Sequence, residues 1–402
     1  MTQQDYTFSP GPRPKRRGWL KKTLISMASI VGLVVALLGG GYIYLTSSLN
    51  AAGIDVYTSK GEQFQLPTAE EINGPINILL IGSDTRAGQG STAYGPSGAE
   101  LADVIILIHV SQDRSNAVAM SFPRDLMVSV PECPNPDGGD PYPARDLIQI
   151  NATMNTGGPA CTLVAIQALT GVKIPYLAMI DFKGVIAMSE VVGGVNVCVS
   201  EDINDPKTNL FLNAGEHSLV GDQALAFLRT RYGVGDGSDL SRISNQQVFL
   251  TSLVRKLKDE GVLSNPFKMI RVGTAALENM TLSKSLTKLE VMLGMAREVN
   301  QVDLDMITFL KLPVYGMTGA NAGRVALIEE KSNFLFEKIA ADEPLILAKA
   351  NPGSGAVVVE EEATAAGSDA SEPDASATRS NEPEPLPDWV QGTKASVKSC
   401  SK

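Results

Sequence analysis

Histidine is nearly absent from this chain, which has two in 402 residues, His109 and His217. His109 ends an apolar segment and His217 lies in a polar one. Neither has a neighbour typical of a catalytic base, so we expect both to be structural. With so little histidine, the widely separated cysteines do not resemble a zinc site. The chain also lacks a G-x-S-x-G sequence, which makes serine acyl hydrolysis improbable.

Cysteine is scarce as well, with four residues, and four cysteines permit three complete pairings. Cys133 in the loop PECPNPDGG and Cys161 in GGPAC are predicted to form a loop-to-loop disulfide. Cys198 lies inside the apolar run GVNVCV and fits a buried free thiol as well as a disulfide. Disulfides persist mainly outside the cytoplasm. Whether these disulfides can form therefore depends on the compartment in which this part of the chain is located.

Long apolar runs are equally rare. A single stretch, Thr23 to Leu45, is free of charge over the length needed to cross a bilayer. Residues 1–22 before it are basic, which predicts a cytoplasmic N-terminal tail and an extracellular location for everything after the span. No clear small-residue cleavage site follows, so an uncleaved transmembrane helix over 23–45 is favoured over a cleaved signal peptide. Residues 46–74 would form a stalk.

The C-terminal end has a different composition, since residues 349–402 are rich in Ala, Ser, Glu and Pro up to about residue 388. Such a segment buries too little apolar surface to offset the entropy of ordering, which predicts a disordered acidic tail. The remaining residues, 75–348, are predicted to form one extracytoplasmic domain.

Within that domain apolar runs alternate with helical patterns, as in the α/β class. A short helix over 221–228 is predicted to lead into an extended RTR segment, and Ser238 or Asp239 to cap a long helix after it. Gly171 marks a helix C-terminus. The predicted strands are 76–82, 103–110, 117–122, 176–182, 193–199 and 307–312; the other predicted helices are 160–171, 182–194, 283–299 and 325–341.

Between residues 229 and 247 the chain reads RTRYGVGDGSDLSRISNQQ, which contains three arginines in an otherwise acidic region. Arg229 and Arg231, two apart, would share one face of an extended strand. Arg242 and Gln246, four apart, would share one face of a helix. Guanidinium groups bind phosphate oxygens in a planar, bidentate way, so this segment predicts a polyanion site.

Further charged residues stand at the ends of predicted strands, where the sites of α/β domains commonly lie. Gly82-Ser83-Asp84-Thr85-Arg86 follows the first strand, Asp103 opens the second, and Arg124-Asp125 follows the third. Taken singly, Asp84 could form a turn, Asp103 end a strand and Arg124–Asp125 be a surface pair. Their coincidence with the arginine-rich segment favours a shared site.

In this order, GSDTR, a strand-opening Asp, FPRD, a GG pair at 157–158, GGV and RTR…GDGSDLSR…QQ resemble the LytR-CpsA-Psr proteins of Gram-positive cell envelopes. The resemblance covers about residues 75–260 and the N-terminal span. It implies an α/β domain with a central mixed sheet flanked by helices, holding a polyprenyl-pyrophosphate lipid in an apolar groove. It also implies a magnesium-dependent transfer of a glycopolymer phosphate onto peptidoglycan.

By the same resemblance Asp84 and Asp103 would bind Mg²⁺, and Asp239 would act beside the phosphates, as a proton acceptor or as a helix cap. The expected pyrophosphate contacts are Arg86, Arg124, Arg229, Arg231, Arg242 and Gln246, of which Arg124, Arg229 and Arg231 are also assigned to catalysis with Asp239. The chain departs from the family pattern at Leu101 and Gln149, where cations are common, and at Asn245.

The leading hypothesis is thus a membrane-anchored phosphotransferase acting on a polyprenyl-pyrophosphate-linked glycopolymer, with peptidoglycan as acceptor. A pyrophosphatase that uses water as acceptor is one alternative. A non-catalytic envelope module that binds lipid-linked anions is another. Both aspartates favour chemistry, whereas the two missing cations favour simple binding. No nucleic-acid partner is expected.

Overall fold

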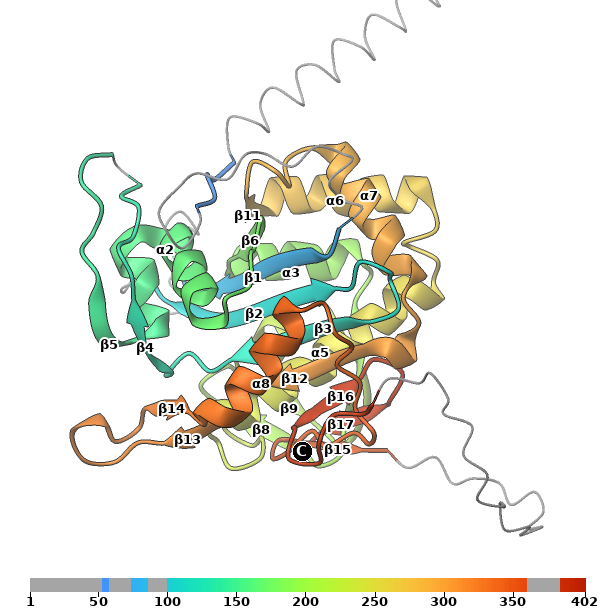
Figure 1. The fold of residues 1–402 in the computed structure, drawn as a ribbon. Coiled ribbons are helices and arrows are strands. Elements are labelled where there is room, and N and C mark those ends of the chain that lie inside the picture. The colour runs from blue at the N-terminus through green and yellow to red at the C-terminus, as the bar shows by residue number, and fades with distance from the viewer. Residues whose placement is uncertain (1–52, 58–73, 86–99, 137, 360–383) are drawn as a thin grey trace, which may run out of the picture. The chain divides into compact units, whose positions relative to one another are not determined.

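The computed structural model describes residues 53–57, 74–85, 100–136, 138–359 and 384–402 (Figure 1). All of them belong to one compact unit that spans residues 52–402. The predicted membrane span at 23–45, nearly all of the stalk and Arg86 lie outside the described residues. Within the described residues, no helix combines the length and the apolar character that crossing a membrane requires.

A mixed seven-stranded sheet forms the centre of the domain, in agreement with the predicted fold class. Its strands pair antiparallel except for two parallel pairs, β1 with β6 and β3 with β12. In spatial order the strands are β11 (Met280–Leu282), β6 (Tyr176–Ile180), β1 (Ile76–Ser83), β2 (Ala102–Val110), β3 (Ala117–Phe122), β12 (Ile307–Lys311) and β16 (Gly392–Lys394).

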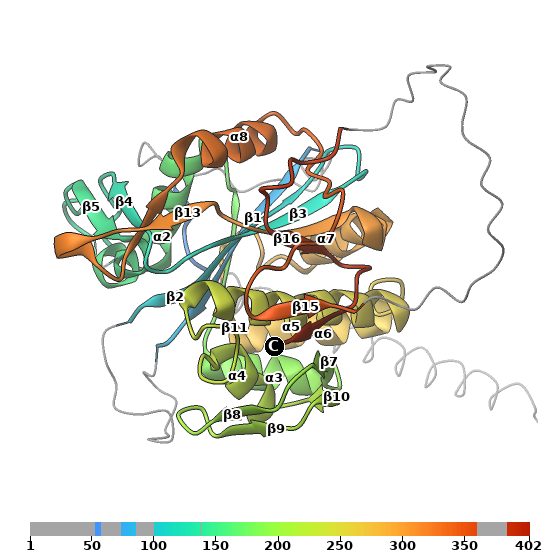
Figure 2. The same ribbon diagram turned by 90° about the horizontal axis from the view of Figure 1, so that it is seen from below.

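Both faces of this sheet are apolar because side chains alternate along each strand. Leu79 and Leu107 pack into one core, with α2 (Thr153–Thr170) and α8 (Glu329–Ala340). Ile106, one position along β2, packs into the opposite core with α7 (Leu289–Gln301) and α5 (Asp239–Asp259). Figure 2 shows α8 and α2 on one side of the sheet and α5, α6 (Pro266–Asn279) and α7 on the other.

A second, four-stranded sheet lies beyond α5, in the order β10 (Gly215–Leu219), β7 (Val195–Val199), β17 (Ser399–Ser401) and β15 (Ala356–Val358). Helix α5 therefore has two apolar sides. Leu250 contacts the core of the central sheet, whereas Val248 and Phe249 pack into a third core with β7. That third core also includes α4 (Asp222–Arg229) and the hairpin of β8 (Ile203–Asp205) and β9 (Leu210–Leu212). Helix α3 (Phe182–Val191) packs beside α4 and α6.

The prediction of a disordered tail over 349–402 is wrong for the residues that the structure describes there. Strand β15 and residues 384–402 are ordered, and β16 and β17 enter the two sheets. Strand β17 lies between β7 and β15, and Ser401 is fully buried. These short segments gain their order from pairing with distant strands, which their own composition cannot show. The domain boundary expected at 348 is therefore wrong as well.

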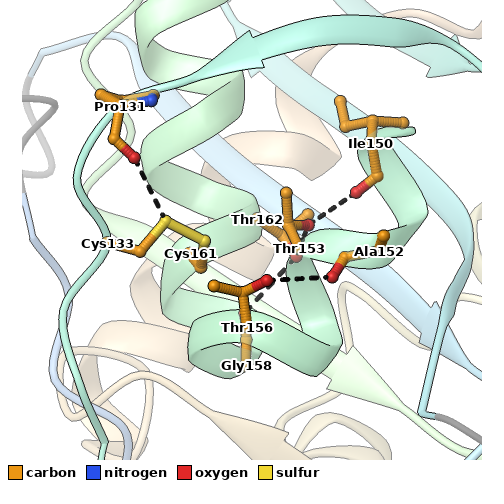
Figure 3. Close-up of a disulfide and its surroundings, with 9 residues drawn as sticks. All are labelled: Pro131, Cys133, Ile150, Ala152, Thr153, Thr156, Gly158, Cys161 and Thr162. Atoms are coloured by element: carbon orange, nitrogen blue, oxygen red, sulfur yellow. Dashed lines mark hydrogen bonds between the residues drawn. A yellow bond between two sulfur atoms is a disulfide. The ribbon is translucent and has the colours of Figure 1, made fainter. Parts of the chain in front are cut away.

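Both disulfides of the chain are formed. The predicted bond between Cys133 and Cys161 is confirmed and ties the loop after β4 (Met127–Val130) to α2 (Figure 3). Cys198 is bonded to Cys400, so its alternative as a free thiol is wrong. Near the first bond α2 is kinked at Gly157 and Gly158. A Cβ atom on Gly157 would lie 2.7 Å from the Pro134 carbonyl oxygen, and Gly158 has a φ of 66°, so both positions favour glycine.

Several element boundaries differ from the predictions, and the sequence patterns did not indicate α6 at all. Gly171 ends α2 in the left-handed conformation as expected, with φ of 70°. The remaining elements are β5 (Arg145–Gln149), β13 (Val314–Gly316), β14 (Val325–Leu327), η2 (Ile150–Ala152), η3 (Leu304–Met306) and η4 (Gly319–Asn321).

The buried His109 predicts a pH dependence of stability. Its Nδ1 lies 2.7 Å from Asn77 Oδ1 and its Nε2 lies 3.1 Å from Asp342 Oδ1. Burial lowers the pKa of His109 from 6.5, and Asp342 opposes this only in part. The unfolded chain then binds a proton that the folded chain does not, so stability is complete above pH 6.5 and falls as the pH drops below that value.

Urea unfolding of the wild type and of His109→Gln between pH 8 and 5 tests this prediction. The free energy of unfolding of the wild type should fall more steeply below pH 6.5 than that of the variant. The difference in slope is limited to about 1.4 kcal/mol per pH unit for one proton. Parallel curves would contradict the prediction.

Candidate functional site

A cavity of about 530 Å³ lies between the central sheet and helices α3 to α6. Its wall has a charged end and a long apolar end. Seven residues singled out from the sequence line it, from segments far apart in the chain: Asp84, Asp103, Arg124, Arg229, Arg231, Arg242 and Gln246. Their expected convergence on one cavity is therefore observed, while the role of each remains a prediction.

Asp84 directly follows β1, and Asp103 lies on the neighbouring strand β2, both at the charged end. Strand β2 has an irregular register there, because Gly82 pairs with Val104 and Ser83 with Ala102, which leaves Asp103 as the extra residue. Such a bulge redirects a side chain. Asp84 is held by the backbone of Leu101, whose N–H donates to Asp84 Oδ1 at 2.8 Å. The side-chain cation common at position 101 is absent, but the backbone of Leu101 still positions the carboxylate.

These two carboxylates fit a magnesium ion that shares its coordination with a phosphate. In the part of the chain that the structure describes, no group of three or more His, Cys, Asp or Glu residues could enclose a metal. Magnesium usually binds one or two protein carboxylates and completes its shell with water and substrate phosphates. Asp84 and Asp103 meet that smaller demand.

Three arginines surround the carboxylates of Asp103 and Asp239. Arg124 Nη1 lies 2.5 Å from Asp103 Oδ1, and Arg242 Nη2 lies 2.6 Å from Asp239 Oδ1. Arg231 Nη2 and Arg124 Nε both lie 3.5 Å from the same Asp239 oxygen. Asp239 is thus a counter-ion shared by three guanidinium groups, although its side chain is not part of the cavity wall.

Helix capping, one of the two roles considered for Asp239, belongs to its neighbour. Ser238 is the N-cap of α5 and its Oγ accepts from the Ser241 N–H at 3.2 Å. Asp239 Oδ2 is buried and has no hydrogen-bond partner among the described residues. Burial of a carboxylate oxygen without a hydrogen-bond partner costs free energy.

Two guanidinium nitrogens in the same network, Arg124 Nε and Arg242 Nε, make no hydrogen bond within the described part of the chain, although Arg124 Nε lies within ion-pair distance of Asp239 and Asp125. Burial lowers the pKa of Arg242, opposed by the carboxylates of Asp239 and Asp103. Burial also acts to lower the pKa of Arg124, but Asp103, Asp239 and Asp125 outweigh it and raise the pKa overall. Arginine stays protonated in proteins in either case. These N–H groups are therefore permanent donors for an anion.

The predicted RTR strand is wrong. Arg229 is the last residue of α4, and Arg231 follows in an irregular turn after the extended Thr230. The guanidinium carbon of Arg229 lies 4.3 Å from the centre of the Phe182 ring. Two arginines two residues apart reach the same cavity because the helix ends between them. Spacing alone does not distinguish this arrangement from a strand.

Asp205, which the sequence analysis did not single out, positions Arg231. It is 1% exposed, and its Oδ2 accepts from Thr230 Oγ1 at 2.7 Å and from the Arg231 N–H at 3.2 Å. These hydrogen bonds lower the pKa of Asp205, although burial alone would raise it. Nothing in the local sequence indicates this role, because Asp205 lies in β8 and its hydrogen-bond partners Thr230 and Arg231 are distant in the chain.

The two amides of α5 anchor the end of α4. Asn245 Nδ2 donates to the Phe227 carbonyl at 2.6 Å, and Gln246 Nε2 donates to the Leu228 carbonyl at 3.1 Å. Asn245 is fully buried, so its departure from a basic residue has a structural reason. Gln246 lines the cavity as predicted, but its amide nitrogen is already hydrogen-bonded to the Leu228 carbonyl of α4.

At the other family departure Gln149 Nε2 donates to Asp125 Oδ1 at 2.8 Å. A neutral side chain thus contacts Asp125 at the position where the family often has a cation. Asp125 also lies beside Arg124, with 3.7 Å between Oδ2 and Nε. The loss of the cation at position 149 therefore leaves the partner of Arg124 anchored.

The apolar end of the cavity is formed chiefly by α3, α5 and α6. Met188, Leu253 and Val272 are typical of its wall. Helices α3 and α6 approach closely at Gly184, where a Cβ atom would lie 2.3 Å from the Asn279 carbonyl oxygen. Helix α3 lines the cavity, whereas α2 packs into the core on the opposite face of the sheet.

Comparisons with known proteins agree with this geometry. A model described as the LytR_cpsA_psr family matches residues 41–338. The cell wall biosynthesis protein LcpA of Corynebacterium glutamicum is 27% identical over 319 residues, 73% of this chain and 60% of that protein. The chain thus matches less than two thirds of that relative's length.

Two further relatives come from Bacillus subtilis. The polyisoprenyl-teichoic acid–peptidoglycan teichoic acid transferase TagT is 26% identical over 256 residues, 61% of this chain and 74% of TagT. The crystal structure of TagV superimposes with a TM-score of 0.53 at 20% identity, covering 67% of this chain and 97% of that one. At this identity the superposition shows a common fold.

Proposed function

Because this chain belongs to the LytR-CpsA-Psr family, as its motifs predicted and as the match over residues 41–338 shows, we propose that it is a membrane-anchored phosphotransferase. It would transfer a glycopolymer phosphate from a polyprenyl-pyrophosphate carrier to peptidoglycan. The predicted span at residues 23–45 would hold the domain on the outer face of the cell membrane.

The observation that carries this proposal is the form of the cavity. One end joins two aspartates to four arginines, and the other end is apolar over three helices. A diphosphate joined to a long hydrocarbon chain has the same two parts. A small phosphorylated metabolite would leave the apolar end empty, whereas a plain fatty chain would make no use of the charged end.

The residues at the charged end can divide the chemistry between them. Arg124, Arg229 and Arg231 would hold the phosphate oxygens and stabilise charge that develops during transfer. Asp84 and Asp103 would hold Mg²⁺, which when bound neutralises charge on the leaving phosphate.

In the transfer itself the acceptor hydroxyl oxygen would bond to the sugar-bearing phosphorus, while the bond from that phosphorus to the bridging oxygen breaks. The bridging oxygen and its electrons leave with the lipid phosphate. Asp239 Oδ2, buried and unpaired among the described residues, is the oxygen proposed to accept the hydroxyl proton. The arginines that contact the other oxygen of Asp239 hold this carboxylate in place.

The relatives support the substrate class. The names of LcpA and TagT refer to cell wall biosynthesis and to transfer of teichoic acid from a polyisoprenyl carrier to peptidoglycan. We extend to this chain the class of donor, a polyprenyl-linked glycopolymer, and the acceptor, peptidoglycan.

The test is an assay of the full-length protein in detergent with a polyprenyl-pyrophosphate-linked saccharide, peptidoglycan and Mg²⁺. Mg²⁺-dependent appearance of the saccharide phosphate on peptidoglycan, with release of polyprenyl phosphate, is the expected result. Release of phosphate products without transfer would favour a pyrophosphatase. Tight binding without turnover, with and without metal, would reduce the protein to a lipid-anion binding module.

A further inference from the structure

The first half of α6 exposes two large apolar side chains. Phe267 is 83% exposed and Ile270 is 42% exposed. They are three residues apart and so share one side of the helix. Phe267 is the most exposed large apolar residue among those that the structure describes. Adjacent uncovered side chains of this size are typical of an interaction surface.

Basic residues stand beside these apolar ones. Lys268 and Arg271 are both exposed, and the first turn of α6 has no acidic residue, although the whole chain has a formal net charge of −10. Asn265 caps the helix, and its Oδ1 accepts from the Phe267 and Lys268 N–H groups at 3.0 and 3.2 Å. The turn that carries the exposed side chains is therefore well fixed. Aromatic and aliphatic groups flanked by cations are typical of helices that lie on anionic membranes.

The same helix forms part of the wall of the cavity. Val272, two residues beyond Ile270, lines the apolar end together with Leu257 of α5. The exposed patch and the lipid-binding end of the cavity are thus on neighbouring turns of one helix. A lipid leaving a bilayer beneath this helix would have a short path to the apolar wall.

The first described residues, 53–57, lie next to the segment that follows the C-terminal end of α6. Ile54 N donates to the Leu282 carbonyl at 2.9 Å, and Lys284 N donates to the Ile54 carbonyl at 2.9 Å. Ile54 therefore lies beside β11, the strand that directly follows α6. Residues 46–53 connect the predicted span to this point, and a chain reaches at most about 3.6 Å per residue. This tether permits contact between α6 and the bilayer.

We propose that the first half of α6 docks the domain on an anionic bilayer, with Phe267 and Ile270 inserted among the lipid chains and Lys268 and Arg271 at the head groups. The apolar end of the cavity then faces the membrane that supplies the substrate. The purpose of this orientation rests on the proposed function, whereas the docking itself does not.

A fluorescent probe at position 267 tests the docking. All four cysteines are in disulfides, so the dye NBD on the single introduced thiol of Phe267→Cys labels one site. Phe211→Cys is the matched control, because Phe211 is 59% exposed on β9, at the opposite end of the domain in Figure 1. Both variants are prepared as full-length protein in vesicles that contain phosphatidylglycerol.

We expect the probe at 267 to shift to the blue and to be quenched by nitroxide-labelled lipids, and the probe at 211 to show neither effect. Equal, solvent-like emission from both probes would overturn the proposal. A blue shift at 267 without lipid quenching would overturn it too, because a protein surface would then cover α6.

Activity gives a second arm. In Phe267→Asp/Ile270→Asp the KM for a long-chain donor embedded in vesicles should rise roughly tenfold or more, the factor that corresponds to keeping one phenylalanine in water. The kcat/KM for a short-chain, water-soluble prenyl pyrophosphate should not change. An equal loss with both donors would contradict docking. If the wild type turns over neither donor, the proposed function fails, while the quenching result still decides the docking.

Discussion

Asp84→Asn should lower phosphotransferase turnover by ~10²–10³-fold while leaving the melting temperature almost unchanged. The substitution removes the negative charge that would bind Mg²⁺ but keeps an Oδ1 acceptor for the Leu101 N–H, which now lies at 2.8 Å. The variant therefore tests the effect of the Asp84 charge on turnover without removing the hydrogen bond that holds its side chain. Turnover as a function of Mg²⁺ concentration is the measurement, together with thermal unfolding.

Asp202→Asn is the matched control for this experiment. Asp202 also uses Oδ1 to accept from a backbone N–H, that of Ala214 at 2.7 Å, but it is exposed and outside the cavity. We expect wild-type turnover and an unchanged metal requirement. If Asp84→Asn behaved like Asp202→Asn, the carboxylate of Asp84 would have no part in the reaction. If Asp84→Asn failed to fold, its role would be structural.

Arg242→Met should lower the free energy of unfolding by about 3–5 kcal/mol and abolish turnover. The Arg242 side chain is 5% exposed and that of Asp239 is 13% exposed, with 2.6 Å between them. Arg242 Nη2 also donates to the Asp103 carbonyl at 2.9 Å. Removing the guanidinium leaves the partly buried carboxylate of Asp239 without its shortest ion pair. Urea unfolding of the variant checks the effect on stability.

A double variant distinguishes a broken ion pair from a mere loss of packing. Asp239→Asn/Arg242→Met should be less destabilised than the sum of the single variants, because the carboxylate left unpaired is removed as well. Additive losses would contradict this explanation.

Arg255→Met is the control, because Arg255 is a half-buried arginine of the same helix that lies outside the cavity. Arg255 Nη1 donates to the Ala395 and Val397 carbonyls at 2.8 and 3.0 Å. The free energy of unfolding should fall by about 1–3 kcal/mol, and the KM for the lipid donor should stay unchanged.

The residues of the site were predictable to the extent that their signals are local. Asp84 and Asp103 stand at the ends of apolar strands, and Arg124 follows a third strand, so the sheet brings them to one edge. Arg242 and Gln246 lie in a helix whose cap and apolar stripe are visible in the sequence. The prediction that both side chains share one face of that helix is correct, since both line the cavity.

The conformation around Arg229 was not predictable in this way. Two residues of separation fit a strand, but they also fit a helix that ends between the two residues, as α4 does. Asp205 determines the path of the turn after Thr230 through contacts between segments that are distant in sequence. Such contacts leave no trace in the pattern of neighbouring residues.

The C-terminal segment shows the same limit on a larger scale. The acidic, proline-rich composition around residues 360–388 dominated the prediction for the whole of 349–402. Strands of three residues, such as β16 and β17, are too short to show a period. They are ordered because the edge of one sheet and the middle of the other provide backbone partners, and because Cys400 is bonded to Cys198.

The amino-acid sequence by itself determined the α/β class, the family, most of the central strands and the identity of the charged residues around the cavity. These properties depend on alternating apolar residues and on the chemistry of short segments, both of which can be read locally. Only the tertiary structure decided that the C-terminal strands complete both sheets, that Asp239 joins three arginines, and that α6 leaves Phe267 uncovered beside the cavity. Each of these follows from contacts between residues distant in the chain, whose free energy depends on how the whole domain packs.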